Sequence, residues 1–129
     1  GENVSGQKVS DRDCATVRIL VAEDNGSNYM LVKVLLKGYN LTRACNGREA
    51  VELAGREKFD IILMDIRMPE MDGAEATRRI REFDPAIPII AVTANAFDED
   101  RRRAFEAGVD DFLTKPLSKA KLFETINQY

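Results

Sequence analysis

Short apolar runs and longer amphipathic runs alternate along the chain from residue 17 to residue 129. The short runs predict five β-strands, at 17–22, 39–45, 60–65, 87–93 and 110–114. Those at 17–22, 60–65 and 87–93 are rich in Val, Ile and Leu. Apolar residues recur at helical spacing after each of the five strands, which predicts helices near 27–38, 46–58, 72–83, 98–108 and 118–129. The pattern therefore predicts five strand–helix units.

The predicted helices carry local start and stop signals. In the first, Met30, Leu31, Val34 and Leu35 form the apolar set at helical spacing, and Gly38 marks its end. The second and third begin with capping-box spacing, Asn46 with Glu49 and Asp72 with Glu75. We interpret the "DEDRRR" segment of the fourth as a solvated helix face at the edge of a partner surface.

Strict alternation of strands and helices implies an α/β fold with a parallel sheet and right-handed crossovers. The near-continuous apolar character of the first, third and fourth strands indicates a doubly wound sheet with helices on both faces. We expect residues 17–129 to form one domain, and the polar, non-periodic residues 1–16 predict a flexible leader or an interdomain linker. In such folds the functional site lies beyond the carboxyl ends of the strands.

Composition narrows the classes of function. The chain has 129 residues, a formal net charge of −3 and no histidine, so a His-based triad, a His metal site and a phosphohistidine on this chain are excluded. The negative charge gives no support to a nucleic-acid partner. No apolar stretch reaches the roughly 20 residues that cross a bilayer, and the cysteines are two and far apart. We expect a cytoplasmic domain with reduced thiols and no direct membrane contact.

Polar side chains follow four of the predicted strands. Glu23 and Asp24 follow the first, Asp65 ends the third, Thr93 ends the fourth, and Lys115 follows the fifth. Because the carboxyl ends of parallel strands meet at one edge of a sheet, we expect these five residues to converge.

Converging carboxylates repel one another unless a counter-charge holds them ionised. A hard divalent cation supplies that charge, and Mg²⁺ prefers carboxylates together with water and phosphoryl oxygens; Mn²⁺ is possible in the same place. Asp65 could then act as a nucleophile that accepts a phosphoryl group. The Lys115 ammonium and the Thr93 hydroxyl would stabilise the negative charge of that group.

Four ordered motifs carry a family resemblance: "AEDN" at 22–25, "MDIRMPEMDG" at 64–73, "AVTANA" at 91–96 and "TKP" at 114–116. Together they resemble the receiver domain of two-component response regulators over residues 17–129. The resemblance implies a flavodoxin-like (βα)5 fold with strand order 2-1-3-4-5. The motifs "MPEMDG" and "AVTANA" resemble those of receivers at the C-terminal end of hybrid sensor histidine kinases, and the linker-like residues 1–16 fit that expectation. A stand-alone response regulator is the alternative.

The resemblance also implies roles for the metal-binding side of the site. Glu23 and Asp24 match the acidic pair that holds Mg²⁺, and Asp65 matches the residue that is both phosphoacceptor and metal ligand. Arg67 would offer its backbone carbonyl to the metal. The side chains of Arg67 and Asn95 occupy positions that tune the rate of phosphoryl hydrolysis in the family.

On the other side of the site, Thr93 would bond the phosphoryl group and move with it, and Lys115 would pair with another phosphoryl oxygen. The Lys115–Pro116 bond is expected to be cis. Phe112 matches the switching aromatic of the family, although a plain core phenylalanine explains the residue equally well. The domain would catalyse its own phosphorylation and dephosphorylation, without turnover of a separate substrate.

The implied partner is a histidine kinase or a histidine phosphotransfer domain, and a phosphorylation-dependent dimer is possible. A phosphatase of the haloacid dehalogenase type would need an acid where Arg67 stands. A flavodoxin-type FMN site would need a neutral loop where Glu23 and Asp24 stand. A pseudo-receiver that only binds proteins is less favoured, because all five key positions are filled.

Overall fold

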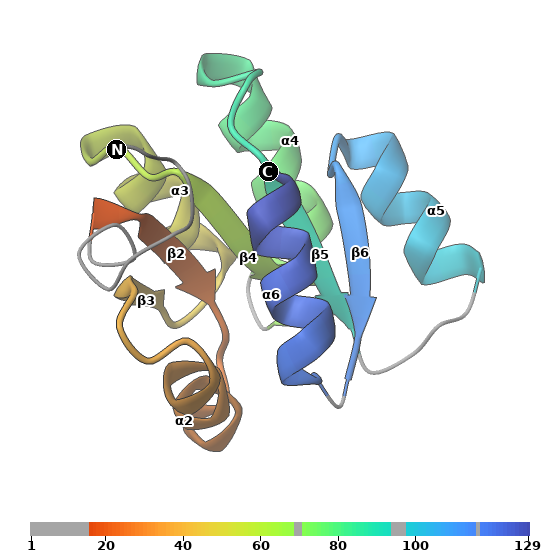
Figure 1. The fold of residues 1–129 in the computed structure, drawn as a ribbon. Coiled ribbons are helices and arrows are strands. Elements are labelled where there is room, and N and C mark those ends of the chain that lie inside the picture. The colour runs from red at the N-terminus through yellow and green to blue at the C-terminus, as the bar shows by residue number, and fades with distance from the viewer. Residues whose placement is uncertain (1–15, 69–70, 94–97, 116) are drawn as a thin grey trace.

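A computed structural model describes residues 16–68, 71–93, 98–115 and 117–129. Within these residues the chain forms one five-stranded parallel sheet (Figure 1), in the order β3-β2-β4-β5-β6, which confirms the predicted order. The strands are β2 (Arg18–Ala22), β3 (Asn40–Ala44), β4 (Ile61–Asp65), β5 (Ile89–Thr93) and β6 (Asp111–Thr114). The predicted leader, apart from Thr16, lies outside the described residues.

Helices cover both faces of the sheet, as predicted for a doubly wound fold (Figure 1). They are α2 (Gly26–Leu35), α3 (Gly47–Arg56), α4 (Gly73–Phe83), α5 (Asp98–Ala107) and α6 (Lys119–Gln128). The apolar side chains of α2 and α6 pack on one face, and those of α3, α4 and α5 pack on the other. None of the helices in the described ranges has the length and apolar character that a bilayer span requires.

The sheet's apolar runs are explained by burial on both faces. All five residues of β4 and of β5 are buried. Alternate residues of β4 point to opposite faces: Ile62 and Met64 join the cluster under α3, α4 and α5, whereas Ile61 and Leu63 join the cluster under α2 and α6. Each such side chain contributes about 1.5–3 kcal/mol by leaving water. This double burial holds the strand ends in fixed positions.

Helix α2 overlaps the predicted range, but three of the four residues expected to form its apolar face are turned outward, and only Leu35 packs against the core. Met30, Leu31 and Val34 are 55%, 42% and 68% exposed, whereas Val32 and Leu36 are buried. Both faces of this helix carry apolar residues, so spacing alone could not tell which one the sheet covers. The prediction of a helix is confirmed, and α2 presents apolar side chains to solvent.

Both predicted caps form at the amino ends of α3 and α4. The Glu49 N–H donates to Asn46 Oδ1 and the Glu75 N–H donates to Asp72 Oδ1, both at 2.9 Å. In neither helix does the Glu side chain accept from the N–H of the N-cap residue, as a capping box would require. The Glu49 carboxylate accepts from the Cys45 N–H at 2.7 Å, and the Glu75 carboxylate pairs with two arginines of its own helix. The helices begin at the predicted residues, because one cap bond is enough to fix the start.

The register of the sheet brings the carboxyl ends of its strands level. Ala22 pairs with Met64, and Met64 pairs with Ala91. At the other side Thr93 pairs with Thr114. The residues that follow these positions therefore meet at one edge of the sheet.

Candidate functional site

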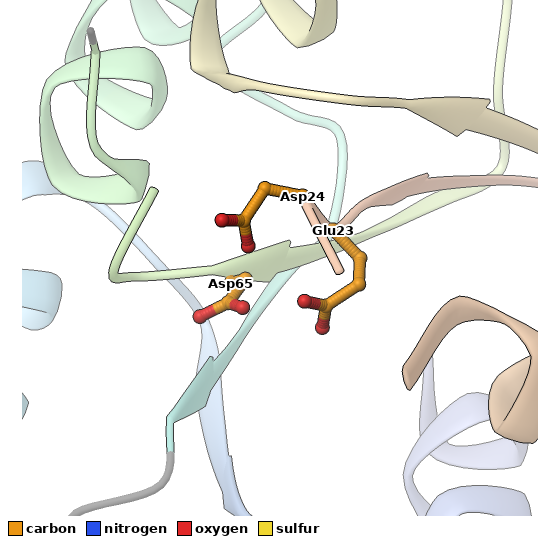
Figure 2. Close-up of side chains that lie close together, drawn as sticks. All are labelled: Glu23, Asp24 and Asp65. Atoms are coloured by element: carbon orange, nitrogen blue, oxygen red, sulfur yellow. The ribbon is translucent and has the colours of Figure 1, made fainter. Parts of the chain in front are cut away.

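Three carboxylates meet at this edge, as the sequence predicted. Glu23 and Asp24 follow β2 and Asp65 ends β4, and one oxygen of each lies within 4.8 Å of the others (Figure 2). Glu23 and Asp65 are only 4% and 5% exposed, whereas Asp24 is exposed. Two of the acids are thus desolvated, and the group opens to solvent at Asp24.

Lys115 lies between the two buried acids. Its Nζ is 3.0 Å from Asp65 Oδ2 and 3.2 Å from Glu23 Oε1. Burial lowers the pKa of Lys115, but the hydrogen bond and charge of Asp65, followed by those of Glu23, outweigh it and raise the pKa above its ordinary value. The ammonium is therefore protonated at neutral pH and neutralises part of the acidic charge.

One ammonium does not balance the acids. Burial, followed by the charge of Asp65, raises the pKa of Glu23 above its ordinary value. The three clustered carboxylates also outnumber the ammonium of Lys115 that contacts two of them, which leaves negative charge in excess at this edge. A hard divalent cation bound by carboxylate oxygens would remove the excess, so the donor set fits Mg²⁺.

The backbone next to the acids holds their side chains in place. The Arg67 N–H donates to Asp65 Oδ1 at 3.1 Å, and the Asn25 N–H donates to Glu23 Oε2 at 3.2 Å. At the start of α4, a Cβ added to Gly73 would lie 2.3 Å from the Asp65 carbonyl oxygen. The helix can therefore approach the end of β4 only because residue 73 has no side chain.

The remaining predicted residues are placed as follows. Thr93 is fully buried at the end of β5, and Phe112 is half-buried in β6, where the Arg101 guanidinium carbon lies 5.8 Å from its ring centre. Asn95 and Pro116 lie outside the described residues, so the hydrolysis-tuning role and the cis bond stay predictions.

Two ion pairs connect the loop after β4 to helix α5. Arg67 Nη2 lies 3.0 Å from Asp100 Oδ2, and Arg103 Nη2 lies 2.7 Å from Asp72 Oδ2. Asp100 is 4% exposed, so the interpretation of 98–103 as a solvated face was wrong for this residue. The charge pattern could not reveal it, because the opposing charges come from a different element.

Arg43 of β3 also contacts the site, although the sequence pattern did not indicate it. Its guanidinium donates to the backbone carbonyls of Glu23 and Asp24. The pairing of β3 with β2 would have indicated this contact, because Arg43 lies opposite Val21, two residues before Glu23. A lone arginine in a strand gives no such indication until the neighbouring strand is known.

Known proteins share this sequence pattern. The model of the response regulator receiver domain matches residues 19–127. The chain is 41% identical, over 98% of its length, to hybrid signal transduction histidine kinase I of Dictyostelium discoideum, of which it spans 8%. It is 39% identical, over 86% of its length, to the polar-differentiation response regulator DivK of Brucella anthropi, of which it spans 94%.

A solved structure shares the fold. It is the receiver domain of the sensor histidine kinase PA1611 from Pseudomonas aeruginosa, described with a magnesium ion coordinated in its active-site cleft. The two agree with a TM-score of 0.83 and 40% identity, over 88% of this chain and 96% of the other. The strand order, the acids at the strand ends and the match over 19–127 have one common explanation: the chain belongs to the response regulator receiver domains of two-component phosphorelay signalling.

Proposed function

We propose that this receiver accepts a phosphoryl group on Asp65 from a phosphohistidine, in a reaction that depends on Mg²⁺. The observation that carries the proposal is the pairing of the Lys115 ammonium with Asp65 and Glu23 inside a group of three carboxylates, which one ammonium does not neutralise. A buried acid with other acids beside it destabilises the folded protein. Such an acid is therefore expected at a functional site where a cation binds.

Glu23, Asp24 and Asp65 would hold the metal ion, with the backbone carbonyl of Arg67 as a further ligand. Mn²⁺ would fit the same oxygen ligands. The bound cation would neutralise the acids and the incoming phosphoryl oxygens. The magnesium ion described for the PA1611 receiver supports this assignment.

In the transfer, a carboxylate oxygen of Asp65 attacks the phosphorus atom. The new P–O bond forms as the P–N bond to the donor imidazole breaks, and the bonding electron pair leaves with the imidazole. Lys115, which now bonds Asp65 Oδ2, would move to a phosphoryl oxygen. The domain would thus catalyse its own phosphorylation, and water would later hydrolyse the acyl phosphate.

The phosphoryl group would then act on the neighbouring elements. Thr93 would bond another phosphoryl oxygen, and Phe112 would change its packing on β6 and alter the surface of α5, β6 and α6. The side chains of Arg67 and Asn95 would set the rate at which water removes the group. A dimer formed by that surface after phosphorylation is part of the same proposal.

The donor would be a phosphohistidine of a kinase or of a phosphotransfer domain. That histidine would lie outside this chain, which contains none. Helix α2 offers a surface for the donor: Met30, Leu31 and Val34 are exposed apolar side chains. Leu31 also lines a hollow of about 270 Å³ whose wall includes Glu23 and Lys115. A donor packed on α2 would therefore reach the acidic site directly.

We propose a hybrid sensor histidine kinase as the parent protein, with this receiver on its cytoplasmic side. The match to a hybrid kinase over 98% of the chain supports it, and the match to DivK over 94% of that regulator keeps a stand-alone regulator as the alternative. A pseudo-receiver has less support, since Glu23, Asp24, Asp65, Thr93 and Lys115 are all present.

Intact mass spectrometry after incubation with Mg²⁺ and acetyl phosphate tests the phosphoacceptor proposal. Wild type should gain one phosphoryl group, and chelation of the metal should prevent the gain. Asp65→Asn should gain none. Glu124→Gln, which removes the same charge from an exposed position of α6, should behave as wild type. A folded, Mg²⁺-binding wild type that gains no phosphoryl group, from acetyl phosphate or from a phosphohistidine donor, would overturn the proposal.

A further inference from the structure

Arg43 makes two contacts with the segment that carries the acidic pair. Its Nε donates to the Glu23 carbonyl oxygen and its Nη2 donates to the Asp24 carbonyl oxygen, each at 3.2 Å. The two acceptors belong to consecutive peptide groups, and a guanidinium presents two donors at a fixed spacing. One side chain of β3 therefore spans both peptide groups of the acidic pair.

The guanidinium is itself held from another direction. Its central carbon lies 5.3 Å from the centre of the Tyr29 ring, a cation–π distance, and Tyr29 belongs to α2. Tyr29 also packs against the apolar cluster under α2 and α6. Arg43 is thus fixed by the strand from which it comes and by a ring anchored in the core.

Hydrogen bonds to the backbone fix the direction in which the Glu23 and Asp24 side chains point. The Glu23 N–H donates to the Ala44 carbonyl at 2.9 Å, and the Asn25 N–H donates to Glu23 Oε2. With the carbonyls of Glu23 and Asp24 bound to Arg43, the backbone is held on both sides of the acidic pair. The two carboxylates then point to Asp65 before any cation arrives (Figure 2).

We propose that Arg43 is a positioning residue for the metal site, which raises the affinity for Mg²⁺ by fixing the backbone of Glu23 and Asp24. This inference rests on the proposed Mg²⁺ site. Its direction is opposite to the effect of charge alone, because a guanidinium near the acids repels a cation. Orientation of ligands by groups that do not touch the metal is a general way to increase metal affinity.

Titration calorimetry with Mg²⁺ alone separates the two effects. Arg43→Lys keeps the charge but loses the planar pair of donors, and Arg43→Met loses both. If positioning dominates, Arg43→Lys binds Mg²⁺ about tenfold more weakly, the lower end of what loss of an orienting partner costs. Arg43→Met also binds Mg²⁺ more weakly than wild type, but by a smaller factor, because loss of the repelling charge offsets part of the effect. Arg48→Met removes the same charge from an exposed position of α3 and should leave the affinity unchanged.

A readout without metal distinguishes positioning from general stability. In the metal-free protein, the amide of Asn25 should exchange with solvent faster in both Arg43 variants, while amides of β4 keep their protection. Tyr29→Leu keeps most of the apolar packing and removes the ring, so it should also weaken Mg²⁺ binding. This variant tests the proposal if Arg43→Met fails to fold.

Two results would overturn the role of Arg43. Tighter Mg²⁺ binding by Arg43→Met with wild-type binding by Arg43→Lys would show that only charge matters. Wild-type affinity in both variants would show that the contacts are structural alone. Failure of wild type to bind Mg²⁺ would contradict the proposed metal site itself. Failure of the Arg43 role alone would leave Mg²⁺ binding by wild type intact, so the two failures can be told apart.

Discussion

At the scale of single residues, Lys115 and the proposed metal ion compete for the same carboxylate oxygens. Lys115 contacts one oxygen each of Asp65 and Glu23, and the proposed metal ion would use oxygens of the same two acids. The ammonium neutralises part of the acidic charge while no cation is present. When a cation binds, Lys115 and the cation share the oxygens of these acids. Lys115 is therefore expected to weaken Mg²⁺ binding and to assist phosphoryl transfer.

Lys115→Met should therefore bind Mg²⁺ more tightly and accept phosphoryl groups more slowly. Removal of one partly buried charge should raise the Mg²⁺ affinity about fivefold, or about 1 kcal/mol. The phosphorylation rate should fall because a phosphoryl oxygen loses its ammonium partner. Calorimetry and a time course of intact mass measure the two effects, with Lys121→Met on the surface of α6 as control. Weaker Mg²⁺ binding in Lys115→Met would contradict the competition.

Asp72 makes stability depend on acid pH. Burial raises the pKa of Asp72, but the Glu75 N–H and Arg103 outweigh it, so the pKa is lowered in the folded state. Its stabilising contribution is complete above the unfolded pKa of 3.8 and is lost as the pH falls through the lowered folded value.

Two replacements of Asp72 should distinguish the contribution of its N-cap hydrogen bond to stability from that of its ion pair with Arg103. Asp72→Ala should cost about 1 kcal/mol at neutral pH, because the N-cap bond is lost. Asp72→Asn should keep the cap, lose the Arg103 pair and reduce the loss of stability below pH 3.8. Urea unfolding across that pH range measures both. An unchanged acid dependence in Asp72→Asn would assign the dependence to other carboxyls.

At the scale of elements, the site depends on how closely α4 approaches the end of β4. Gly73 opens α4 and lies against the Asp65 backbone, and its N–H donates to the Ile66 carbonyl at 2.9 Å. The capping signal at Asp72 predicted where α4 begins. It could not predict this contact, because the distance between a helix and a strand depends on packing that local sequence does not encode.

Gly73→Ala should destabilise the fold by about 1–3 kcal/mol, the usual cost of forcing atoms into a packed region. The displaced loop should also weaken Mg²⁺ binding, because the loop carries Arg67. Gly26→Ala is the matched control: nothing lies within 4 Å of its added Cβ, so stability should change by less than about 1 kcal/mol. Thermal unfolding with and without Mg²⁺ measures both effects. Equal stability of the two variants would contradict the close contact.

At the scale of the whole molecule, the sequence was sufficient for the fold and for the acids at its edge. Hydrophobic alternation predicted the strands and helices, and strand ends predicted that Glu23, Asp65 and Lys115 meet. The supporting contacts of Arg43 and Asp100 were not predictable. Each joins elements far apart in the chain, so its partner is known only when the sheet order and the helix positions are known.

The proposed function requires Asp65 itself to become an acyl phosphate, and chemical mapping tests this requirement most directly. Borohydride reduces an acyl phosphate to an alcohol and releases phosphate, so a phosphorylated aspartate becomes homoserine. After phosphorylation in Mg²⁺, peptide fragmentation should find homoserine at position 65 alone. Homoserine at position 24 or at any other acid would contradict phosphorylation of Asp65. Absence of homoserine from a protein whose intact mass shows a phosphoryl group would contradict it as well.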